Sequence, residues 1–254
     1  MSKLTDKNSY TVIFAIVMVL VVGTLLAGVA QSLRDRISEN ERFEKQQNIL
    51  YAMGINNNKG PSDVAFVPAD EVAEKFDTYI KRQVVVQGGE FTEDDEAYLI
   101  DVKQEGSKAK ADKNYQRKLP IFIGEKDGKT VYIVPMRGNG LWDAIWGFMA
   151  IDENLKVEGV FFDHAGETPG LGANIKERYF MDPFHGEELM DDSDHFRGIT
   201  VAKGNNDPRN DRKGDHKVDA LAGSTITGDG VTAMIKRDVA MYIPYIKELI
   251  NEQQ

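Results

Sequence analysis

The sequence predicts an α+β protein: one N-terminal transmembrane helix followed by a mixed, mainly antiparallel sheet domain with flanking helices. Three observations carry this prediction. Residues 8–33 contain no charged side chain, β-rich runs cluster in the middle of the chain, and helical periodicity marks both ends of the remaining sequence. Strands grouped between helices, rather than alternating with them, favour α+β over a doubly wound fold.

The composition excludes several classes of function. The chain has 254 residues, a formal net charge of −10 and no cysteine. An acidic balance disfavours nucleic acid as a partner, because phosphates require a basic surface. The absence of cysteine excludes disulfides, cysteine-ligated zinc, iron–sulfur ligation and thiol catalysis within this chain.

The uncharged N-terminal stretch is long enough to cross about 30 Å of hydrocarbon at about 1.5 Å per residue. We expect a short cytoplasmic N-terminus over residues 1–9 and a transmembrane helix over 10–32. A cleaved signal peptide is the alternative, with "LAGVAQ" (26–31) as the cleavage site. The apolar run is too long for that reading, and helical rhythm continues directly beyond it.

Charge alone gives a weak orientation for this span. Counting lysine and arginine places the large domain in the cytoplasm, because fewer basic residues precede the span than follow it. The residues counted are Lys3 and Lys7 before it, and Arg34, Arg36, Arg42 and Lys45 after it.

A connecting helix over 33–60 is expected next, stopped by "NNNKGPSD" (56–63), and then a domain over 61–254. Residues 68–81 read as a short amphipathic helix. "RQVVVQ" (82–87) and "AYLIDV" (97–102) read as strands, and the apolar-poor stretch 103–118 as a surface excursion.

The central strands follow. Two β-rich runs around Asp127-Gly128 predict a hairpin over 120–136, and further strands are expected in 141–152, 156–165 and 198–204. A short helix is expected over 174–184. From about Gly228 the chain reads as helix to its end, because apolar residues recur at helical spacing: Val231, Met234, Ile235, Tyr242, Ile246 and Leu249.

Two possible chemical motifs are weak. "GDGVTA" (228–233) fits a loose dinucleotide pattern but lacks the preceding strand and the downstream acid of a βαβ unit. The four histidines show no ligand spacing and no HExxH, so no metal site is predicted. Of these four we retain His216 as a candidate, because it lies just before Asp219.

Two glycine-rich segments allow two readings. "ETPGLG" (167–172) is either a tight loop or a place where bare backbone and Thr168 approach a flat ligand. "RGNGLWDAIWG" (137–147) is a glycine loop followed by Trp142 and Trp146, which are core aromatics or part of a cofactor site.

"DALAGSTITGDGV" (219–231) places three hydroxyls before a long helix. One reading is helix capping, in which Ser224, Thr225, Thr227 or Asp229 accepts a backbone N–H. The other is chemical: a phosphate esterified to one hydroxyl would lie at the positive N-terminus of the helix. Small neighbours such as Gly223 leave room for a bulky group.

This stretch resembles the flavinylation signature of FMN-binding domains, usually Asp-Gly-x-Ser/Ala-Gly-Ala-Thr-x-Thr. Residues 164–173 ("HAGETPGLGA") and 137–147 resemble two further blocks of the C subunit of the sodium-translocating NADH:quinone oxidoreductase. The N-terminal helix and "QQNILYAMGI" (46–55) also fit that family. The resemblance spans most of the chain, and the order and spacing of the motifs are more specific than any single one.

The resemblance implies covalent FMN in phosphoester linkage to Thr225. In the family, a separate Mg²⁺-dependent flavin transferase uses FAD as donor; the threonine oxygen attacks phosphorus and AMP leaves. Ser224 departs from the family, which usually has alanine there, so Ser224 and Thr227 remain alternative acceptors. The resemblance also places further residues around the flavin: Gly223, Asp219, His216, Glu167, Thr168, Leu171, Gly172 and Trp142.

By the same resemblance the domain is periplasmic on a single-pass inner-membrane protein, which outweighs the charge count. The chain would pass electrons between an iron–sulfur centre and another flavin in its partners, within a complex of six subunits. It would have no catalytic residue of its own. The alternatives are the G subunit of the related ferredoxin:NAD electron-transport complex, and a cofactor-free membrane-anchored sensor or scaffold.

Overall fold

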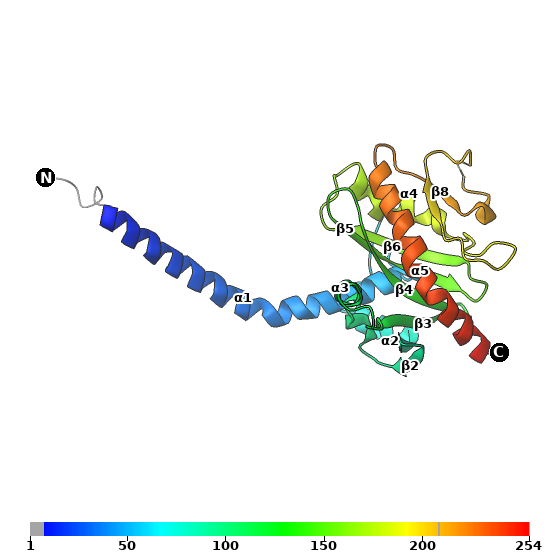
Figure 1. The fold of residues 1–254 in the computed structure, drawn as a ribbon, viewed down its shortest axis with the longest axis horizontal. Coiled ribbons are helices and arrows are strands. Elements are labelled where there is room, and N and C mark those ends of the chain that lie inside the picture. Colours follow the sequence, from blue (N-terminus) through cyan, green and yellow to red (C-terminus); the bar gives the residue numbers. More distant parts are fainter. Residues whose placement is uncertain (1–7, 208, 254) are drawn as a thin grey trace. The chain divides into compact units, whose positions relative to one another are not determined.

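A computed structural model describes residues 8–207 and 209–253 (Figure 1). The chain divides into two compact units, the first ending at Arg42 and the second starting at Phe43. Of the predicted cytoplasmic N-terminus, residues 1–7 lie outside the described residues. The architecture confirms the predicted class: an N-terminal apolar helix and a mainly antiparallel sheet domain with flanking helices.

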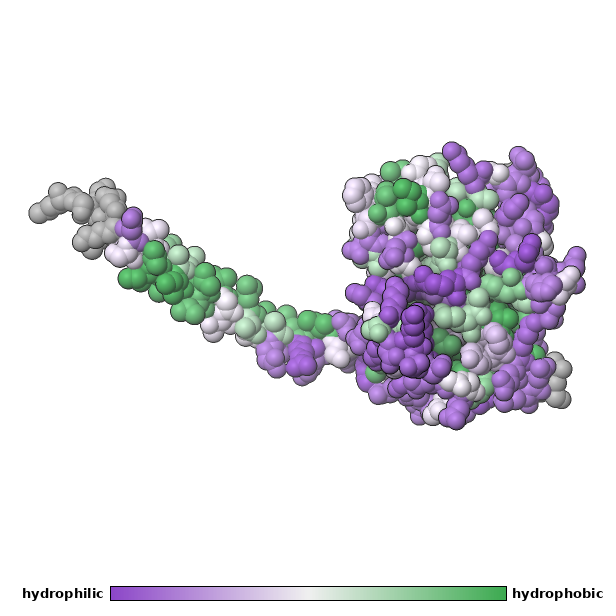
Figure 2. Space-filling view, in the orientation of Figure 1, coloured by the Kyte–Doolittle hydropathy of each residue, from purple (hydrophilic) through white to green (hydrophobic). Residues whose placement is uncertain are grey.

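The first helix, α1 (Asn8–Ala52), covers the predicted span and much of the predicted connecting helix without a break. In the described part of the chain it is the one helix long and apolar enough to cross a membrane, and Figure 2 shows apolar side chains along its first half. Val12, Leu20 and Leu25 are all exposed there, as expected of a surface that faces lipid.

The second unit is built on a six-stranded antiparallel sheet in the order β2-β1-β3-β4-β5-β6. The strands are β1 (Ile80–Gln87), β2 (Glu90–Glu93), β3 (Leu119–Lys126), β4 (Lys129–Asn139), β5 (Ala144–Asp152) and β6 (Val157–His164). β3 and β4 form the predicted hairpin. Asp127 and Gly128 have φ values of 53° and 74°, as a two-residue primed turn requires.

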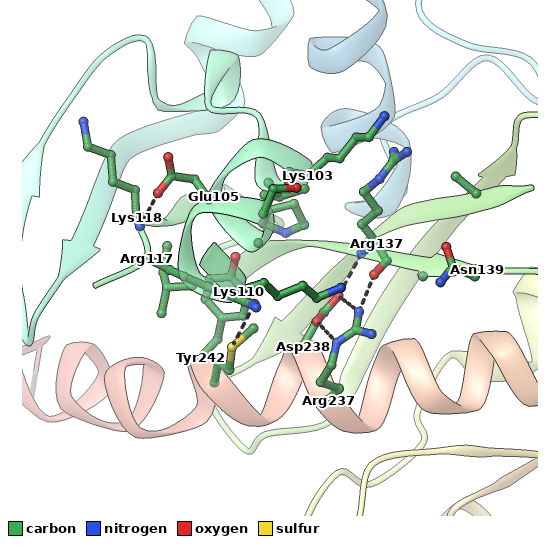
Figure 3. Close-up of a pocket in the computed structure, with 18 of the residues that line it drawn as sticks. Lys103, Glu105, Lys110, Arg117, Lys118, Arg137, Asn139, Arg237, Asp238 and Tyr242 are labelled. Atoms are coloured by element: carbon green, nitrogen blue, oxygen red, sulfur yellow. Dashed lines mark hydrogen bonds and ion pairs between the residues drawn. The ribbon is translucent and has the colours of Figure 1, made fainter. Parts of the chain in front are cut away.

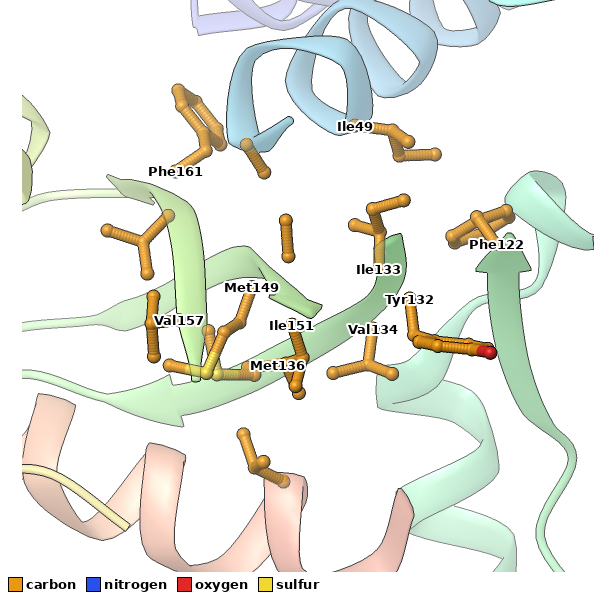
Figure 4. Packing of buried hydrophobic residues seen from close by; sticks show 14 of the residues in the cluster. Ile49, Phe122, Tyr132, Ile133, Val134, Met136, Met149, Ile151, Val157 and Phe161 are labelled. Atoms are coloured by element: carbon orange, nitrogen blue, oxygen red, sulfur yellow. The ribbon is translucent and has the colours of Figure 1, made fainter. Parts of the chain in front are cut away.

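Helices cover both faces of this sheet. The end of α1 packs on one face and α5 (Thr225–Gln253) on the other, so the central strands are buried on both sides (Figure 4). On each face of the sheet a glycine lets the backbone of the helix lie close to the backbone of a strand. A Cβ on Gly159 would lie 2.4 Å from the Ala52 carbonyl oxygen, and one on Gly230 would lie 2.2 Å from the Asn139 carbonyl oxygen.

The remaining elements are short. They are α2 (Val72–Tyr79), η2 (Ala97–Leu99), α3 (Val102–Ala111), η3 (Gly172–Lys176), α4 (Arg178–Met181), η4 (Asp182–Phe184), β7 (Thr200–Ala202), η5 (Lys213–Asp215) and β8 (Lys217–Asp219). β7 and β8 pair in parallel, which makes the sheet content mixed. The predicted short helix at 174–184 exists as three consecutive short turns of helix.

One prediction in the middle of the chain was wrong. Residues 97–102 form a 3₁₀ turn and the start of α3, not a strand, and the helix continues through residues 103–111 of the predicted surface excursion. Asp101 explains the difference, because its carboxylate accepts from the backbone N–H groups of Lys103 and Gln104 and caps α3. Buried Glu105 then ties this helix to the following segment.

Glu187, between η4 and β7, is a fully buried acid. One carboxylate oxygen accepts from Asn210 Nδ2 at 2.7 Å, with Lys213 Nζ at 3.7 Å, and the other has no partner in the described part of the chain. Burial raises the pKa of Glu187 to about 7, although Asn210 and Lys213 act in the opposite direction.

We therefore expect the free energy of unfolding to fall as the pH rises from about 4.5 to about 7. In that window the unfolded chain loses the Glu187 proton while the folded chain keeps it, which costs the folded state a few kcal/mol. Urea unfolding across this range would show a decline that is much reduced in Glu187→Gln. An unchanged slope in the variant would contradict the assignment.

Candidate functional site

The three hydroxyl groups predicted as possible acceptors, at the N-terminus of α5, differ in their exposure to solvent. Thr225, the first residue of the helix, is exposed. Ser224 is only 6 % exposed and Thr227 only 1 % exposed. The turn before them depends on Gly223, whose φ of 76° favours glycine. Thr225 is therefore the one hydroxyl of the three that a second macromolecule can reach directly.

Glu167 joins three segments that are distant in the sequence. Its carboxylate accepts from the Thr227 hydroxyl at 2.6 Å, from the Trp142 backbone N–H at 2.8 Å and from the Asp143 N–H at 3.4 Å. The 137–147 loop, the 167–172 loop and the first turn of α5 thus meet at one buried side chain. This brings together the three blocks on which the family resemblance rested.

Two glycines make space for this carboxylate. A Cβ on Gly140 would lie 2.5 Å from one Glu167 oxygen, and a Cβ on Gly172 would lie 2.4 Å from the other. No side-chain carbon can stand that close to an oxygen without movement of one of them. The glycines of both loops therefore allow close packing around Glu167, and the expected contact of Gly172 with the flavin stays a prediction.

Electrostatics keep Glu167 ionised. Burial acts to raise its pKa, but the hydrogen bonds from Thr227 and from the backbone N–H groups of the 141–143 loop outweigh burial and hold the pKa below its ordinary value. The carboxylate of Glu167 is therefore buried and its charge is stabilised by hydrogen-bond donors of the protein itself.

Glu167→Gln should lower the free energy of unfolding at pH 7 by about 1–3 kcal/mol, because the amide cannot accept all three hydrogen bonds. The depressed pKa contributes stability above the ordinary glutamate pKa that is lost as the pH falls through the folded value. The variant should therefore lose less stability on acidification. Urea unfolding at pH 7 and in acid tests this, with exposed Glu153→Gln as the control; equal behaviour of both variants would refute it.

Each of the three segments that meet at Glu167 carries an exposed apolar side chain. Trp142 is 70 % exposed, Ile226 56 % and Leu171 42 %. The Trp142 indole N–H donates to the Thr168 hydroxyl at 3.1 Å, and the end of the Leu171 side chain lies 3.0 Å from where a Gly223 Cβ would be. Figure 2 shows apolar surface at this upper end of the domain. A flat apolar group would find both van der Waals surface and polar edges here.

Two of the predicted site residues have other contacts. His216 lies in a left-handed turn with φ of 57°, and its Nδ1 is 2.7 Å from the Glu188 carbonyl oxygen. Asp219 is exposed at the end of β8 and accepts from the Asn205 N–H at 3.3 Å. The contacts of both residues are thus with the 188–205 region rather than with the Glu167 cluster.

Sequence reasoning missed two residues of the site. Ile226 is exposed although it is apolar and lies on a helix, and Gly140 is required by Glu167. The "GNG" run was a signal for Gly140, since two nearby glycines mark close backbone approach. No local signal identifies Ile226, because its exposure follows from how α5 packs on the sheet.

The geometry fits a phosphate-linked group. The first turn of a helix presents backbone N–H groups without intrahelical partners and a partial positive charge, and Thr225 stands at that position on α5. The Ser224 hydroxyl is buried and has no hydrogen-bond partner among the described residues. Across residues 8–207 and 209–253, no cluster of three or more His, Cys, Asp or Glu side chains could hold a metal ion.

Comparison with known proteins identifies the family of the chain. The family described as FMN-binding domain matches residues 140–240, which include the 167–172 loop, the 219–231 stretch and all but the first three residues of the 137–147 block. The C subunit of the Na⁺-translocating NADH-quinone reductase of Pseudomonas aeruginosa is 31 % identical, over 91 % of this chain and 90 % of that protein. The same subunit of Yersinia pestis is also 31 % identical, over 89 % and 86 % respectively.

Solved structures show the same relationship. The corresponding protein of Parabacteroides distasonis, also a C subunit of this reductase, superposes with a TM-score of 0.70 and 30 % identity, covering 84 % of this chain and 96 % of that one. NqrC of Shewanella oneidensis, at 24 % identity and a TM-score of 0.61, shares the fold. On identity, coverage and structure together, this chain belongs to the family of C subunits of the Na⁺-translocating NADH-quinone reductase.

Proposed function

We propose that this chain is the electron-carrier subunit of a Na⁺-pumping NADH:quinone oxidoreductase and holds FMN covalently through a phosphoester to Thr225. The single observation that carries the proposal is the exposure of Thr225 at the start of α5, between the buried hydroxyls of Ser224 and Thr227. An acceptor must be reached by the transferring enzyme, and Thr225 alone of the three meets that condition.

The residues around Thr225 would hold the group in distinct ways. The N–H groups of the first turn of α5 would bind the phosphoryl oxygens. Trp142, Leu171 and Ile226 would contact the apolar faces of the flavin ring, and Thr168 would supply a polar edge. Glu167 would act through Thr227 and the 140–143 loop by fixing their positions. Asp219, exposed, is available for recognition by the modifying enzyme.

When bound, FMN supplies redox chemistry and accepts or donates electrons singly or in pairs. The chain supplies position and surroundings, with electrons passing between an iron–sulfur centre and another flavin in partner subunits. A covalent link suits a carrier that must not lose its cofactor between transfers. NADH oxidation, quinone reduction and Na⁺ transport would belong to the assembled complex.

The proposed topology is a single α1 span in the bacterial inner membrane with the domain in the periplasm. Attachment there requires a periplasmic flavin transferase that uses FAD and Mg²⁺, since this chain has no nucleotide-activating motif of its own. The Thr225 oxygen would bond to the FMN phosphorus, its proton would be released, and AMP would leave.

The test is to express the full chain with and without such a transferase, then to compare intact mass and in-gel flavin fluorescence. We expect one added FMN, less one water, only when the transferase is present, with the modification on the peptide that contains residues 219–231. An unmodified chain beside a transferase shown to be active on another substrate would instead support the cofactor-free anchor.

A further inference from the structure

Ser224 has a hydroxyl group without a hydrogen-bond partner, next to the residue that is proposed to carry the flavin. The Ser224 carbonyl oxygen accepts from the Gly228 N–H at 2.9 Å, which makes Ser224 the N-cap residue of α5. Ser224 is only 6 % exposed, and its Oγ is buried with no partner among the described residues. An unpaired buried hydroxyl lowers stability, so this one requires a physical explanation.

The Ser224 hydroxyl does not cap the helix. A serine at the N-cap usually accepts from the backbone N–H of the second or third helical residue, which here are Ile226 and Thr227. Neither N–H donates to Ser224 Oγ, and neither has another acceptor in the part of the chain that the structure describes. The start of α5 therefore combines free backbone N–H groups with a free hydroxyl.

A phosphoester at this end of α5 would find few cationic side chains. The three blocks of the site, residues 137–147, 164–173 and 219–231, contain a single lysine or arginine, which is Arg137. Its guanidinium lies 5.9 Å from the Trp146 ring centre, and Figure 3 shows its side chain directed away from α5. The negative charge of a phosphate must then be met by neutral donors, which are backbone N–H groups and hydroxyls.

Two buried hydroxyls flank Thr225, and one of them has its proton free. The Thr227 hydroxyl already donates to Glu167 at 2.6 Å, so its proton is used. The Ser224 hydroxyl turns about one bond, and it can donate to an oxygen on the neighbouring residue without breaking another hydrogen bond. An aspartate at this N-cap would instead repel a phosphate, and an alanine would offer no donor.

We propose that the Ser224 hydroxyl donates a hydrogen bond to a phosphoryl oxygen of the FMN linked to Thr225. This inference rests on the proposed function, because it requires a phosphoester on Thr225. Ser224 is then a binding residue for the phosphate, together with the N–H groups of Ile226 and Thr227, and it forms no bond to phosphorus. The family usually has alanine at position 224, so this contact is a feature of the present chain.

The proposal predicts opposite effects of Ser224→Ala on the two forms of the chain. Without flavin, alanine removes an unpaired buried hydroxyl, so the melting temperature should stay the same or rise. With FMN attached, alanine removes a hydrogen bond to an anion, so the melting temperature should fall by at least about 3 °C. A capping role would instead lower the melting temperatures of both forms equally.

The test measures thermal unfolding of the full chain in detergent, produced with and without an active flavin transferase. Intact mass establishes that each flavinylated sample carries one FMN, and peptide mapping establishes which residue carries it. Phosphorus NMR of the flavinylated chain then observes the phosphate directly, and its resonance should move between wild type and Ser224→Ala. Ser224→Cys keeps the shape and only a weak donor, so it should show the same sign with a smaller loss.

The matched control is Asp101→Ala, which removes the N-cap side chain of a different helix, α3. It should lower the melting temperatures of both forms equally and leave the phosphorus resonance in place.

The outcomes separate this inference from the proposed function. Wild type that takes no flavin beside a transferase active on another substrate overturns the proposed function, and the Ser224 contact with it. Wild type with FMN on Thr225 overturns the Ser224 contact alone if Ser224→Ala shifts both forms equally, or if it shifts neither form and leaves the phosphorus resonance unmoved. FMN found on Ser224 also overturns the contact, because an esterified oxygen has no proton to donate.

Discussion

Thr225→Ala abolishes covalent flavin attachment if the phosphoester is formed where we propose. The expected result is a fluorescent band for the wild-type chain and a dark band for the variant, both expressed with an active flavin transferase. The reason is chemical, since alanine has no oxygen to bond to phosphorus. Folding should be unaffected, because Thr225 is exposed at the first position of α5.

Three further substitutions make this result specific. Thr225→Ser should keep the attachment, because the nucleophilic oxygen is retained. Ser224→Ala restores the residue usual in the family and should remain fluorescent, because the Ser224 hydroxyl is buried. Thr227→Ala removes the hydrogen bond to Glu167 and should lower stability while a flavin is still attached. A fluorescent Thr225→Ala beside a dark Ser224→Ala would transfer the acceptor role to Ser224.

Much of the fold could be predicted because its signals are local. The first part of α1 is marked by a continuous uncharged stretch, and the turn between β3 and β4 is marked by the neighbouring residues Asp127 and Gly128. The final helix shows its buried face through apolar spacing alone. Its start at Thr225, earlier than the expected Gly228, extends the helix to the hydroxyl that is proposed to carry the flavin.

The region around α3 could not be read in the same way. "AYLIDV" has the composition of a strand, but strand formation needs a free neighbouring edge, which no local pattern reveals. The residues after it are polar, so no apolar stripe marks them as helical. The helix depends on the Asp101 cap and on Glu105, whose partners Tyr115 and Lys118 come ten or more residues later.

The candidate site shows the same division. The glycine-rich blocks were recognisable as motifs, and the family resemblance named Glu167, Thr168 and Gly172 together. Their physical roles were not recognisable, because those roles depend on contacts between loops some 25 to 60 residues apart. The place of Glu167 beside the flavin stays a prediction, whereas the hydrogen bonds by which its carboxylate joins the three loops could not be predicted from the sequence.

Gly230 is the position where helix packing and site geometry are most directly coupled. It belongs to the "GDGVTA" run that resembled a dinucleotide motif, and it faces β4 instead. A Cβ at Gly230 would lie 2.2 Å from the Asn139 carbonyl oxygen and 3.4 Å from Ile145 Cδ1. The atom it meets is backbone, so a side-chain rotation cannot relieve the contact.

Gly230→Ala should therefore lower the free energy of unfolding by about 3 kcal/mol or more, despite alanine's better helix propensity, which alone would stabilise by up to about 1 kcal/mol. The matched control is Gly106→Ala in α3, where the nearest atom to the new Cβ is Arg117 Nη2 at 3.8 Å. That variant should be neutral or slightly stabilising. Urea unfolding of both at pH 7 measures the difference.

The displacement of α5 from β4 should also reach the flavin site, because Asn139 leads directly into the loop whose N–H groups bind Glu167. We expect Gly230→Ala to be flavinylated more slowly than wild type even at temperatures where it is fully folded, since Thr225 and the 140–143 loop would no longer be held in register. Gly106→Ala should be modified at the wild-type rate. If Gly230→Ala lost stability but kept that rate, α5 would position Thr225 independently of its contact with β4, and the coupling would have to run through Glu167 and Thr227 alone.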